Sequence, residues 1–456
     1  MTAAPRPQPG APRAYAFPLV ERSELGNGLR VEVAKAPRLP LVTVFALVDA
    51  GAARDEKGSE GIASLTAQAL REGTTRLDGA SLTEQCERLG TGLDADGDWD
   101  CAAAQMTVTA ARLDAAIALL GEVLTTPAFS EREVERLRAE RLADLLQQQT
   151  EPRGLADDKF AGFLYIAGSR YGLPKAGTTA AVRGLSAARA RAFHSAHYAP
   201  GTTTVIVVGD VNSDRATRMV ERALGTWKGA PPVTSPVDDR TNFGTRRVKV
   251  VHKPDAPQSE LRIGHRGVPR GHRDYFPIVV MNALLGGLFS SRINLNLRER
   301  NAYTYGARST FDWRRQAGPF VVATAVKTEV TDAATREILR EITLLREEMV
   351  GDEELSLATA YLDGVFPIRY ETTHAVAEAI AVANVHTLDA DYYGTYRDHV
   401  RAVTAADVRR AAETHLHPDE LLVLAVGDAG AIRDPLERLA IGPLDVYEAH
   451  EDGASP

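Results

Sequence analysis

The sequence predicts an α+β fold made of two homologous halves, each a layered, mostly antiparallel sheet with helices packed on one side. Two observations predict this fold class. An internal repeat relates the two halves, and within each half a run of strands comes before a run of helices, which is typical of α+β layers. The chain has 456 residues, 44% hydrophobic and 25% charged, so it is long enough to form more than one core.

The repeat is an ungapped match at a constant offset of 218 residues. Residues 186–210, SAARARAFHSAHYAPGTTTVIVVGD, align with residues 404–428, TAADVRRAAETHLHPDELLVLAVGD. Each copy predicts a Ser or Thr N-cap, a helix, a stop that contains proline, and a β-branched strand closed by Gly-Asp. GNGLRVEVAK from Gly26 and GTRRVKVVHK from Gly244 keep the same offset and predict the opening strand of each half.

The domain boundaries follow from composition. The segment GAPPVTSPVDDRTN, residues 229–242, concentrates Pro, Ser and Asp, which is typical of a linker. We therefore expect a flexible N-terminal arm over 1–20, a first domain over 21–228, a linker over 229–243, a second domain over 244–440 and a C-terminal tail over 441–456.

Charge and hydropathy exclude several function classes. The net charge of −8 comes from interspersed signs with no basic stripe, so we expect no nucleic-acid partner and no polybasic membrane anchor. No run of about 18 apolar residues predicts a transmembrane helix. The first residues contain no continuous apolar stretch typical of a secretory signal, so we expect a cytoplasmic protein. Cys86 and Cys101 fit neither a disulfide framework nor a zinc knuckle and are expected to be buried thiols.

Four segments carry a resemblance to a known family: LGNGLRVEV (25–33), GSEGIASLTAQALREGT (58–74), HYAPGTTTVIVVGD (197–210) and LLGGLFSSRINLNLRERNAYTYGA (284–307). They resemble the pitrilysin, insulinase and mitochondrial-processing-peptidase family of zinc peptidases, over roughly residues 20–430. This resemblance implies a fold of two peptidase-like domains.

The resemblance also indicates where a zinc site should lie. Active members carry His-x-x-Glu-His directly after a Gly-apolar-Ala triplet like Gly61-Ile62-Ala63, so that two imidazoles bind zinc and the glutamate acts as general base. This chain has Ser64, Ala67 and Gln68 at the positions of the two histidines and the glutamate. We therefore predict no metal and no cofactor in this chain.

The remaining candidate ligands predict structural roles. The resemblance places the third zinc ligand near Ala143 or Asp144, and we expect both Asp144 and the nearby Glu140 on a solvated helix face. His194 and His197 are one turn apart, but no acidic base lies between them. His415 and His417 end a predicted helix, where histidines often contact the terminal carbonyls.

A functional pair is predicted in the second half. In the family, the second half contributes an arginine and a tyrosine seven residues apart that contact substrate and the tetrahedral intermediate, and Arg298 and Tyr305 match this spacing. A guanidinium can bind peptide carbonyls in a fork, and a phenol can donate to an oxyanion. The alternatives are an ion pair between Arg298 and Glu299, and a tyrosine that packs in the sheet. Tyr305 is preferred over Tyr303 on spacing alone.

Two further segments are interpreted structurally. Gly286 and Gly287 predict a tight turn between helices, because no phosphate-loop sequence follows them. The acidic stretch DADGDWD, residues 94–100, lacks the glutamate of a calcium loop and predicts a loop. The strand that follows, CAAAQMTVTA, corresponds by resemblance to the edge on which a peptide adds as an extra strand.

We therefore expect a zinc-free subunit of a heteromeric metallopeptidase that cleaves unstructured peptides and that is not catalytic alone. A homologous partner subunit would carry the intact motif and the zinc, while this chain supplies Arg298 and Tyr305. Two alternatives stay open: a non-catalytic structural core subunit of the same fold, and a factor that binds or matures a peptide without cutting it.

Overall fold

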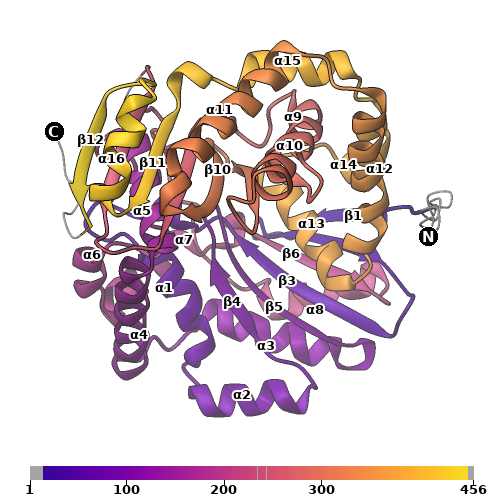
Figure 1. The fold of residues 1–456 in the computed structure, drawn as a ribbon. Helices are drawn as coiled ribbons and strands as arrows, with labels where there is room; N and C mark the ends of the chain where they lie inside the picture. Colours follow the sequence, from indigo (N-terminus) through magenta and orange to yellow (C-terminus); the bar gives the residue numbers. More distant parts are fainter. Residues whose placement is uncertain (1–13, 234, 243, 450–456) are drawn as a thin grey trace, which may run out of the picture.

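Two six-stranded sheets dominate the computed structural model, which describes residues 14–233, 235–242 and 244–449 (Figure 1). The first half contains β1 (Val20–Glu24), β2 (Arg30–Lys35), β3 (Leu41–Val48), α1 (Ile62–Ala69), α2 (Gly79–Arg88), β4 (Asp94–Gly97), β5 (Ala102–Thr109), α3 (Leu113–Thr125), α4 (Glu131–Thr150), α5 (Pro152–Leu164), α6 (Thr179–Arg183), α7 (Ala187–His197), β6 (Thr203–Gly209) and α8 (Ser213–Leu224).

From β2 onward, the second half repeats this order of strands and helices, and it ends in an additional strand, β12. It contains β7 (Arg247–His252), β8 (Gln258–Arg266), α9 (Tyr275–Asn282), α10 (Arg292–Asn294), β9 (Ala307–Trp313), β10 (Ala317–Lys327), α11 (Thr331–Glu347), α12 (Asp352–Arg369), α13 (Thr373–Val385), α14 (Tyr392–Ala402), α15 (Ala405–His415), β11 (Leu422–Gly427), α16 (Ala429–Arg438) and β12 (Leu444–Glu448). Two π-helical turns, η6 (Ala283–Gly287) and η7 (Leu295–Arg300), flank α10.

The two sheets have related topologies. The strand orders are β1-β2-β6-β3-β5-β4 and β12-β7-β11-β8-β10-β9, and most neighbouring strands are antiparallel. The expected α+β class and the two halves are therefore confirmed. β4 is the edge of the first sheet and β9 is the edge of the second.

The repeat offset of 218 residues holds for the helix and strand of residues 186–210, but the opening strands depart from it by one residue. Arg30 pairs with Thr204, and Arg247 pairs with Leu422. Thr204 and Leu422 are 218 residues apart, whereas Arg30 and Arg247 are 217 apart. A shift of one residue moves every side chain to the opposite face of a sheet. The hydrogen-bonded register, which makes Arg30 equivalent to Arg247, is therefore the correct alignment of the two opening strands, and the alignment of the matched glycines is not.

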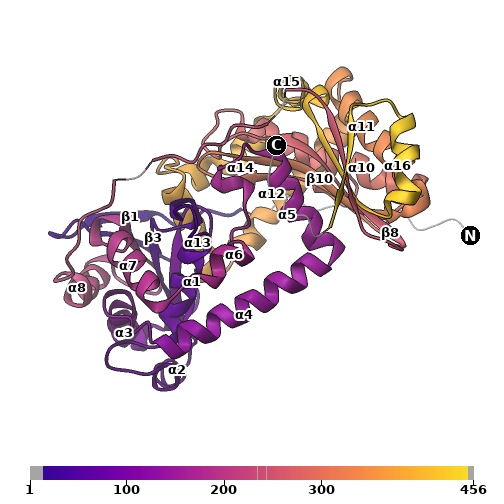
Figure 2. The ribbon, with the colours of Figure 1, turned by 90° about the vertical axis from the view of Figure 1, so that its left-hand side faces the viewer.

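Each half contributes one helix to the other half's sheet. In Figures 1 and 2, α5 lies against the second sheet and α13 against the first. Leu155, Phe160 and Leu164 of α5 form a core cluster with Leu422, Leu424 and Val426 of β11. Val376, Ala377 and Ile380 of α13 form another with Phe45, Leu47, Ile206 and Val208 of the first sheet. Each sheet therefore carries its own helices on one face and a helix of the other half on the opposite face.

Residues near both ends of the described chain are folded, although two of the expected boundaries placed them outside the domains. Tyr15 donates a hydrogen bond to the carbonyl of Tyr370 (2.7 Å), and the ring of Phe17 stacks on Tyr393. These residues lie in the segment expected to be a flexible arm. β12 pairs in parallel with β7, although we expected residues 441–456 to form a tail. Contacts with the second half, which sequence composition does not reveal, therefore correct both boundaries for residues 14–20 and 441–449, while residues 1–13 and 450–456 lie outside the described residues.

One helical stretch of the described chain, Tyr275–Arg300, is long and apolar enough to cross a membrane by length and composition, with a mean hydropathy of 1.4. Both that hydropathy and a buried share of 50% describe the most apolar 18-residue window of the stretch. Ile278, Met281, Leu285, Ile293 and Leu297 belong to the core beneath the second sheet. Packing within the fold accounts for the apolar character of this stretch.

Candidate functional site

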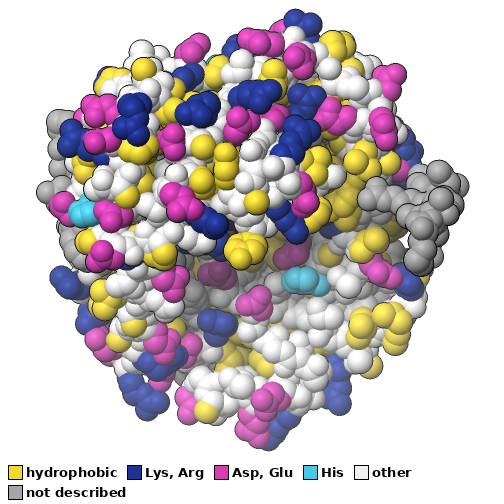
Figure 3. Space-filling model, in the orientation of Figure 1, with side chains coloured by type: hydrophobic (Ala, Val, Ile, Leu, Met, Phe, Trp, Pro, Cys, Tyr) yellow, Lys and Arg dark blue, Asp and Glu magenta, His cyan; other side chains and the backbone are white. Residues whose placement is uncertain are grey.

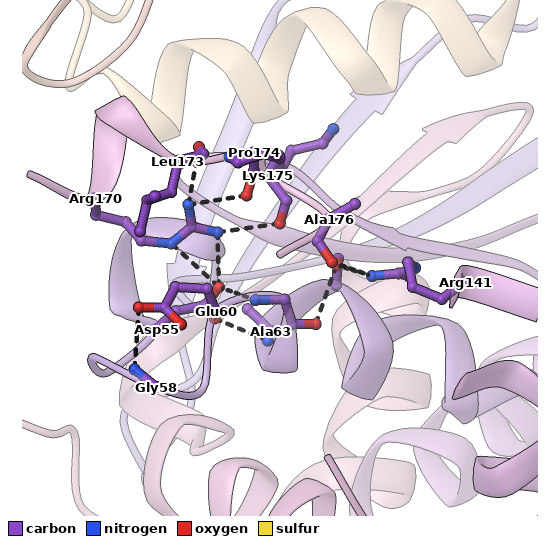
Figure 4. Close-up of polar contacts among 12 residues, drawn as sticks. Asp55, Gly58, Glu60, Ala63, Arg141, Arg170, Leu173, Pro174, Lys175 and Ala176 are labelled. Carbon is purple, nitrogen blue, oxygen red and sulfur yellow. Dashed lines mark hydrogen bonds and ion pairs between the residues drawn. The ribbon is translucent and has the colours of Figure 1, made fainter. Parts of the chain in front are cut away.

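The helix α1 occupies the position where the resemblance places a zinc-binding helix. Gly61 precedes it with a φ of 94° and provides no side-chain cap. The carboxylate of Asp55 accepts hydrogen bonds from the backbone N–H groups of Gly61 (2.7 Å) and Ala63 (2.9 Å) instead. Arg170 donates to the same carboxylate at 2.8 Å (Figure 4). Burial raises the pKa of the Asp55 carboxyl, and Arg170 and the two N–H groups oppose that rise.

A backbone crossing fixes the start of α1. A Cβ atom on Gly61 would lie 2.3 Å from the carbonyl oxygen of Ala176, and one on Gly177 would lie 2.1 Å from the carbonyl oxygen of Glu60. Both glycines also have positive φ, so other residues would be strained there. Arg170 donates to the carbonyls of Pro174 (3.0 Å) and Lys175 (3.1 Å), which holds the crossing loop in place (Figure 4).

Arg141 of α4 lies against the positions of the missing zinc ligands. Its guanidinium donates to Ser64 Oγ at 2.8 Å and to Gln68 Oε1 at 2.5 Å, as well as to the carbonyl of Ala176 at 3.2 Å. The side chain is buried, with a residue exposure of 6%. Burial lowers the pKa of Arg141, while the nearby carboxylates of Asp96, Asp144 and Asp55 favour its charged form.

These residues do not fit a zinc ion. Zinc needs imidazole, thiolate or carboxylate ligands. Ser64 and Gln68 offer only a hydroxyl and an amide, and Ala67 offers no donor atom. A guanidinium already occupies the hydrogen-bonding position between them, and its positive charge repels a cation. Two of the positions that lack zinc ligands are thus hydrogen-bonded to a buried arginine of the neighbouring helix.

Arg141 is the residue that sequence reasoning missed. The two carboxylates it considered on this helix, Glu140 and Asp144, are exposed, and Glu140 pairs with Arg136 at 2.7 Å. The signal for Arg141 is present in the sequence. The buried residues of α4 are Val134, Leu137, Arg141 and Leu145, so the arginine stands in the apolar stripe of its helix.

One histidine of each pair makes a side-chain hydrogen bond within the fold. His194 donates from Nε2 to the carbonyl of Leu124 at 2.9 Å, which agrees with the expected structural role. The expectation for His415 was wrong, because its Nε2 donates to the carboxylate of Asp274 at 2.8 Å rather than to a helix carbonyl. His272 also places a ligand atom within 4.8 Å of these two groups. Since Arg410 pairs with Asp274 at 3.0 Å, an ion-pair network joins α15 to the start of α9.

Arg298 and Tyr305 line the same cavity at the edge of the second sheet. The cavity has a volume of about 620 Å³ and is lined by residues of η6, η7, β8, β9, β10 and the start of α5. Tyr305 is 93% exposed in the loop before β9. Tyr303 is half-buried against the second core and does not line the cavity. Of the two tyrosines compared by spacing, Tyr305 lines the cavity and Tyr303 does not.

Arg298 is half-exposed and makes two weak contacts. Its Nε lies 3.4 Å from Glu299 Oε1, and its guanidinium lies 4.4 Å from the centre of the Phe289 ring. The alternative ion pair considered from the sequence is thus present, but its distance is long and both side chains reach solvent. An exposed pair of this kind contributes at most about 1 kcal/mol, so Arg298 can exchange it for a peptide carbonyl at little cost.

The glycine pair that precedes the cavity has a packing role. Gly286 and Gly287 end the π-helical turn η6, and a Cβ atom on Gly286 would lie 2.5 Å from both the backbone nitrogen and the Oγ of Ser309 on β9. The expected tight turn is therefore corrected to a close approach between η6 and the edge strand. This contact positions the strand next to the loop that carries Tyr305.

The predicted peptide-binding edge is also corrected. Residues 94–97, expected in a loop, form β4 and pair with β5 in the register Asp94↔Gln105 to Gly97↔Ala102. β5 therefore lies between β3 and β4, and β4 is the edge. Buried and exposed residues alternate along this segment, as in a strand: Ala95 and Gly97 are buried, and Asp94 and Asp96 are exposed. The prediction of a loop rested on the acidic residues and overlooked this alternation.

Two models of one family match the chain. The model described as insulinase (peptidase family M16) matches residues 30–162, and the model described as peptidase M16 inactive domain matches residues 184–362. Together they match well over half of the chain. The chain belongs to the M16 peptidase family. The model that spans Arg298 and Tyr305 is the one described as inactive.

Relatives and solved structures agree with this membership. The chain is 24% identical to an uncharacterized zinc protease of Streptomyces coelicolor, over 86% of each chain. It is 21% identical to a probable β subunit of the mitochondrial-processing peptidase of Arabidopsis thaliana, over 88% of this chain and 77% of the relative.

Among structures, a peptidase M16 inactive domain from Pseudomonas fluorescens superposes with a TM-score of 0.84 at 22% identity, over 90% of this chain and 98% of the other. A chain of complex III2 from Candida albicans superposes with a TM-score of 0.77 at 16% identity, over 92% and 99%. At these identities the structures establish the shared fold.

Proposed function

We propose that this chain is the zinc-free subunit of a heteromeric metallopeptidase that cleaves unstructured peptides. A homologous subunit with an intact His-x-x-Glu-His motif carries the zinc, and this chain supplies Arg298 and Tyr305. The observation that carries the proposal is the contrast between two sites in one chain. Arg141 hydrogen-bonds Ser64 and Gln68, the positions where the resemblance places zinc ligands in the first half, while Arg298 and Tyr305 stay accessible in the cavity of the second half.

The two side chains have complementary roles. The guanidinium of Arg298 donates paired hydrogen bonds to carbonyl oxygens of the peptide and so fixes its position. The phenol of Tyr305 donates one hydrogen bond to the oxyanion that forms when the scissile carbonyl is attacked. The zinc subunit supplies the metal and the general base. The edge strand β9 begins two residues after Tyr305, which favours a peptide that binds in extended form.

A structural core subunit is the second candidate, and the similarity to a chain of complex III2 favours it. A purely structural subunit needs no accessible phenol beside an arginine in a cavity. The 93% exposure of Tyr305 therefore supports the peptidase subunit. A factor that binds peptides without cutting them would use the same cavity and differs only in the absence of turnover.

The test is co-expression with a homologous chain that carries the zinc motif, followed by cleavage of an unstructured fluorogenic peptide. We expect turnover from the assembled pair and little from either chain alone. Metal analysis of this chain alone should give far less than one zinc per chain. Peptide cleavage by this chain by itself would contradict the proposal, and so would an assembled pair that is no more active than the zinc subunit.

A further inference from the structure

The cavity that holds Arg298 and Tyr305 is strongly basic. Four arginines line it (Arg153, Arg262, Arg298 and Arg308), together with one carboxylate, Glu260, and no lysine or aspartate. Its formal charge is therefore +3, in a chain whose net charge is −8. A local charge opposite to that of the whole chain indicates a site for an anion.

One of these arginines already pairs with carboxylates of the protein itself. Arg262 is buried and donates to Glu260 at 2.9 Å and to Asp157 of α5 at 2.6 Å. This network neutralises the one carboxylate of the cavity wall. Glu260 is therefore not available to pair with a ligand cation, and Arg262 is not available to bind a ligand anion.

Arg153 and Arg308 are different. Both are exposed, and neither side chain makes an ion pair or a hydrogen bond to another described residue. Arg153 stands in the first turn of α5, which comes from the first half of the chain, and Arg308 stands on the edge strand β9. Two elements far apart in sequence thus bring unpaired guanidinium groups to the cavity of Arg298 and Tyr305.

The first half presents the opposite charge. A cavity of about 330 Å³ beside its edge strand β4 is lined by Asp94, Asp96 and Asp98 of the first half and by Glu378 of α13 from the second half, with Lys175 as the one basic residue. Lys175 pairs with Asp98 at 3.1 Å. The face in Figure 3 is recessed at mid-height, between the two halves, and side chains of both signs lie in and around the recess.

We propose that Arg153 and Arg308 form a carboxylate-binding subsite that selects acidic peptides. The carboxylate is that of an Asp or Glu side chain, or the C-terminal carboxylate of the peptide, bound beside the groups that contact the scissile region. This inference rests on the proposed function for the nature of the ligand, a peptide. Guanidinium groups bind carboxylates through paired hydrogen bonds, and two unpaired ones that line one cavity make a charge-selective site.

The test measures binding to this chain alone, by fluorescence anisotropy of labelled unstructured peptides at low ionic strength. One peptide carries two glutamates, a matched peptide carries glutamines, and each is made with a free and an amidated C-terminus. We expect the glutamate peptide to bind about tenfold more tightly than its glutamine match, and salt to reduce the difference. If peptides with a free C-terminus bind more tightly than amidated ones, and glutamate gives no advantage, the bound carboxylate is that of the peptide C-terminus.

The variants decide the assignment. Arg153→Gln with Arg308→Gln should abolish the preference, whereas Arg218→Gln, an exposed arginine of α8 in the first half, should leave it unchanged. Thermal unfolding checks that all variants keep the fold. Equal binding of all four peptides, no measurable binding of any, or a preference that survives the double substitution would overturn the subsite. Because no zinc subunit and no cleavage enter the readout, the subsite can fail or hold independently of the proposed catalysis.

Discussion

Arg141 joins two helices through a buried charge. Its guanidinium donates to Ser64 and Gln68 on α1, and to the carbonyl of Ala176 in the loop that crosses the start of that helix. A buried charge is tolerated only when hydrogen bonds replace the water that it loses. These hydrogen bonds hold α1 against α4 through protein groups alone.

The substitution Arg141→Ala should destabilise the protein by about 2–4 kcal/mol, because it leaves Gln68 and the Ala176 carbonyl without their partner and opens a cavity. Urea unfolding at neutral pH measures the change in the free energy of unfolding. Arg132→Ala on the same helix is the matched control: its side chain is 91% exposed and should change stability by less than about 0.5 kcal/mol. Equal effects of the two substitutions would contradict the structural role of Arg141.

At the residue scale, the sequence indicated that the zinc ligands are missing, but it did not indicate which residue bonds to their positions. The loss of ligands at Ser64, Ala67 and Gln68 follows from side-chain chemistry once their positions are known. Arg141 lies 73 residues after Gln68, and only the packing of α4 on α1 brings them together. The role proposed for Arg298 and Tyr305 is still a prediction, although the structure places both in one cavity.

A buried ion pair links two helices of the second half. Asp363 of α12 is 3% exposed, and Arg397 and Arg401 of α14 donate to its carboxylate at 2.6 and 2.8 Å. Burial raises the pKa of this carboxyl, but the hydrogen bonds from both arginines outweigh it, so that its pKa lies below the ordinary value of 3.8. The pair therefore stabilises the fold above that pH.

The pH dependence of stability should reveal this pair. Because the pKa of Asp363 is lower in the folded than in the unfolded protein, its contribution is complete above pH 3.8 and is lost as the pH falls through the folded pKa. Asp363→Asn should cost about 3 kcal/mol near neutral pH, and its difference from wild type should shrink below pH 4. Urea unfolding between pH 2.5 and 7 measures this, with the exposed Asp114→Asn as control. A constant difference over the whole range would contradict the assignment.

Elements were predictable where local signals agreed. The N-cap, helix, proline stop and strand of residues 186–210 form α7 and β6 as expected. β4 was not, because its four residues are acidic or small and only pairing with β5 makes them a strand. The register of β2 and β7 was likewise decided by hydrogen bonds to β6 and β11, which are distant in sequence.

The two halves depend on each other at the scale of the whole molecule. Besides the exchanged helices α5 and α13, Arg315 of the second half donates from its side chain to Asp49 at 2.6 Å and from its backbone to Asp100 at 2.9 Å. Tyr165 donates to the carbonyl of Ala317 at 2.9 Å. The internal repeat revealed two domains, but repeat and composition contain no information about which helix covers which sheet.

An isolated first half should therefore not fold independently. A fragment of residues 1–243 lacks α13 and would expose Phe45, Leu47, Ile206 and Val208, each of which contributes about 1.5–3 kcal/mol when buried. We expect no cooperative thermal unfolding from this fragment, and recovery of folded protein when residues 244–456 are co-expressed with it. Cooperative unfolding of the fragment alone would show that the exchanged helix is dispensable.

The central claim is that this chain completes the active site of a zinc-bearing partner. Its most direct test is peptide turnover by the assembled pair with Arg298→Ala in this chain, compared with Arg300→Ala, an exposed arginine two residues away that does not line the cavity. We predict that Arg298→Ala lowers kcat by about 100-fold or more with assembly and thermal stability unchanged, and that Arg300→Ala keeps wild-type turnover. Wild-type turnover with Arg298→Ala would contradict the account.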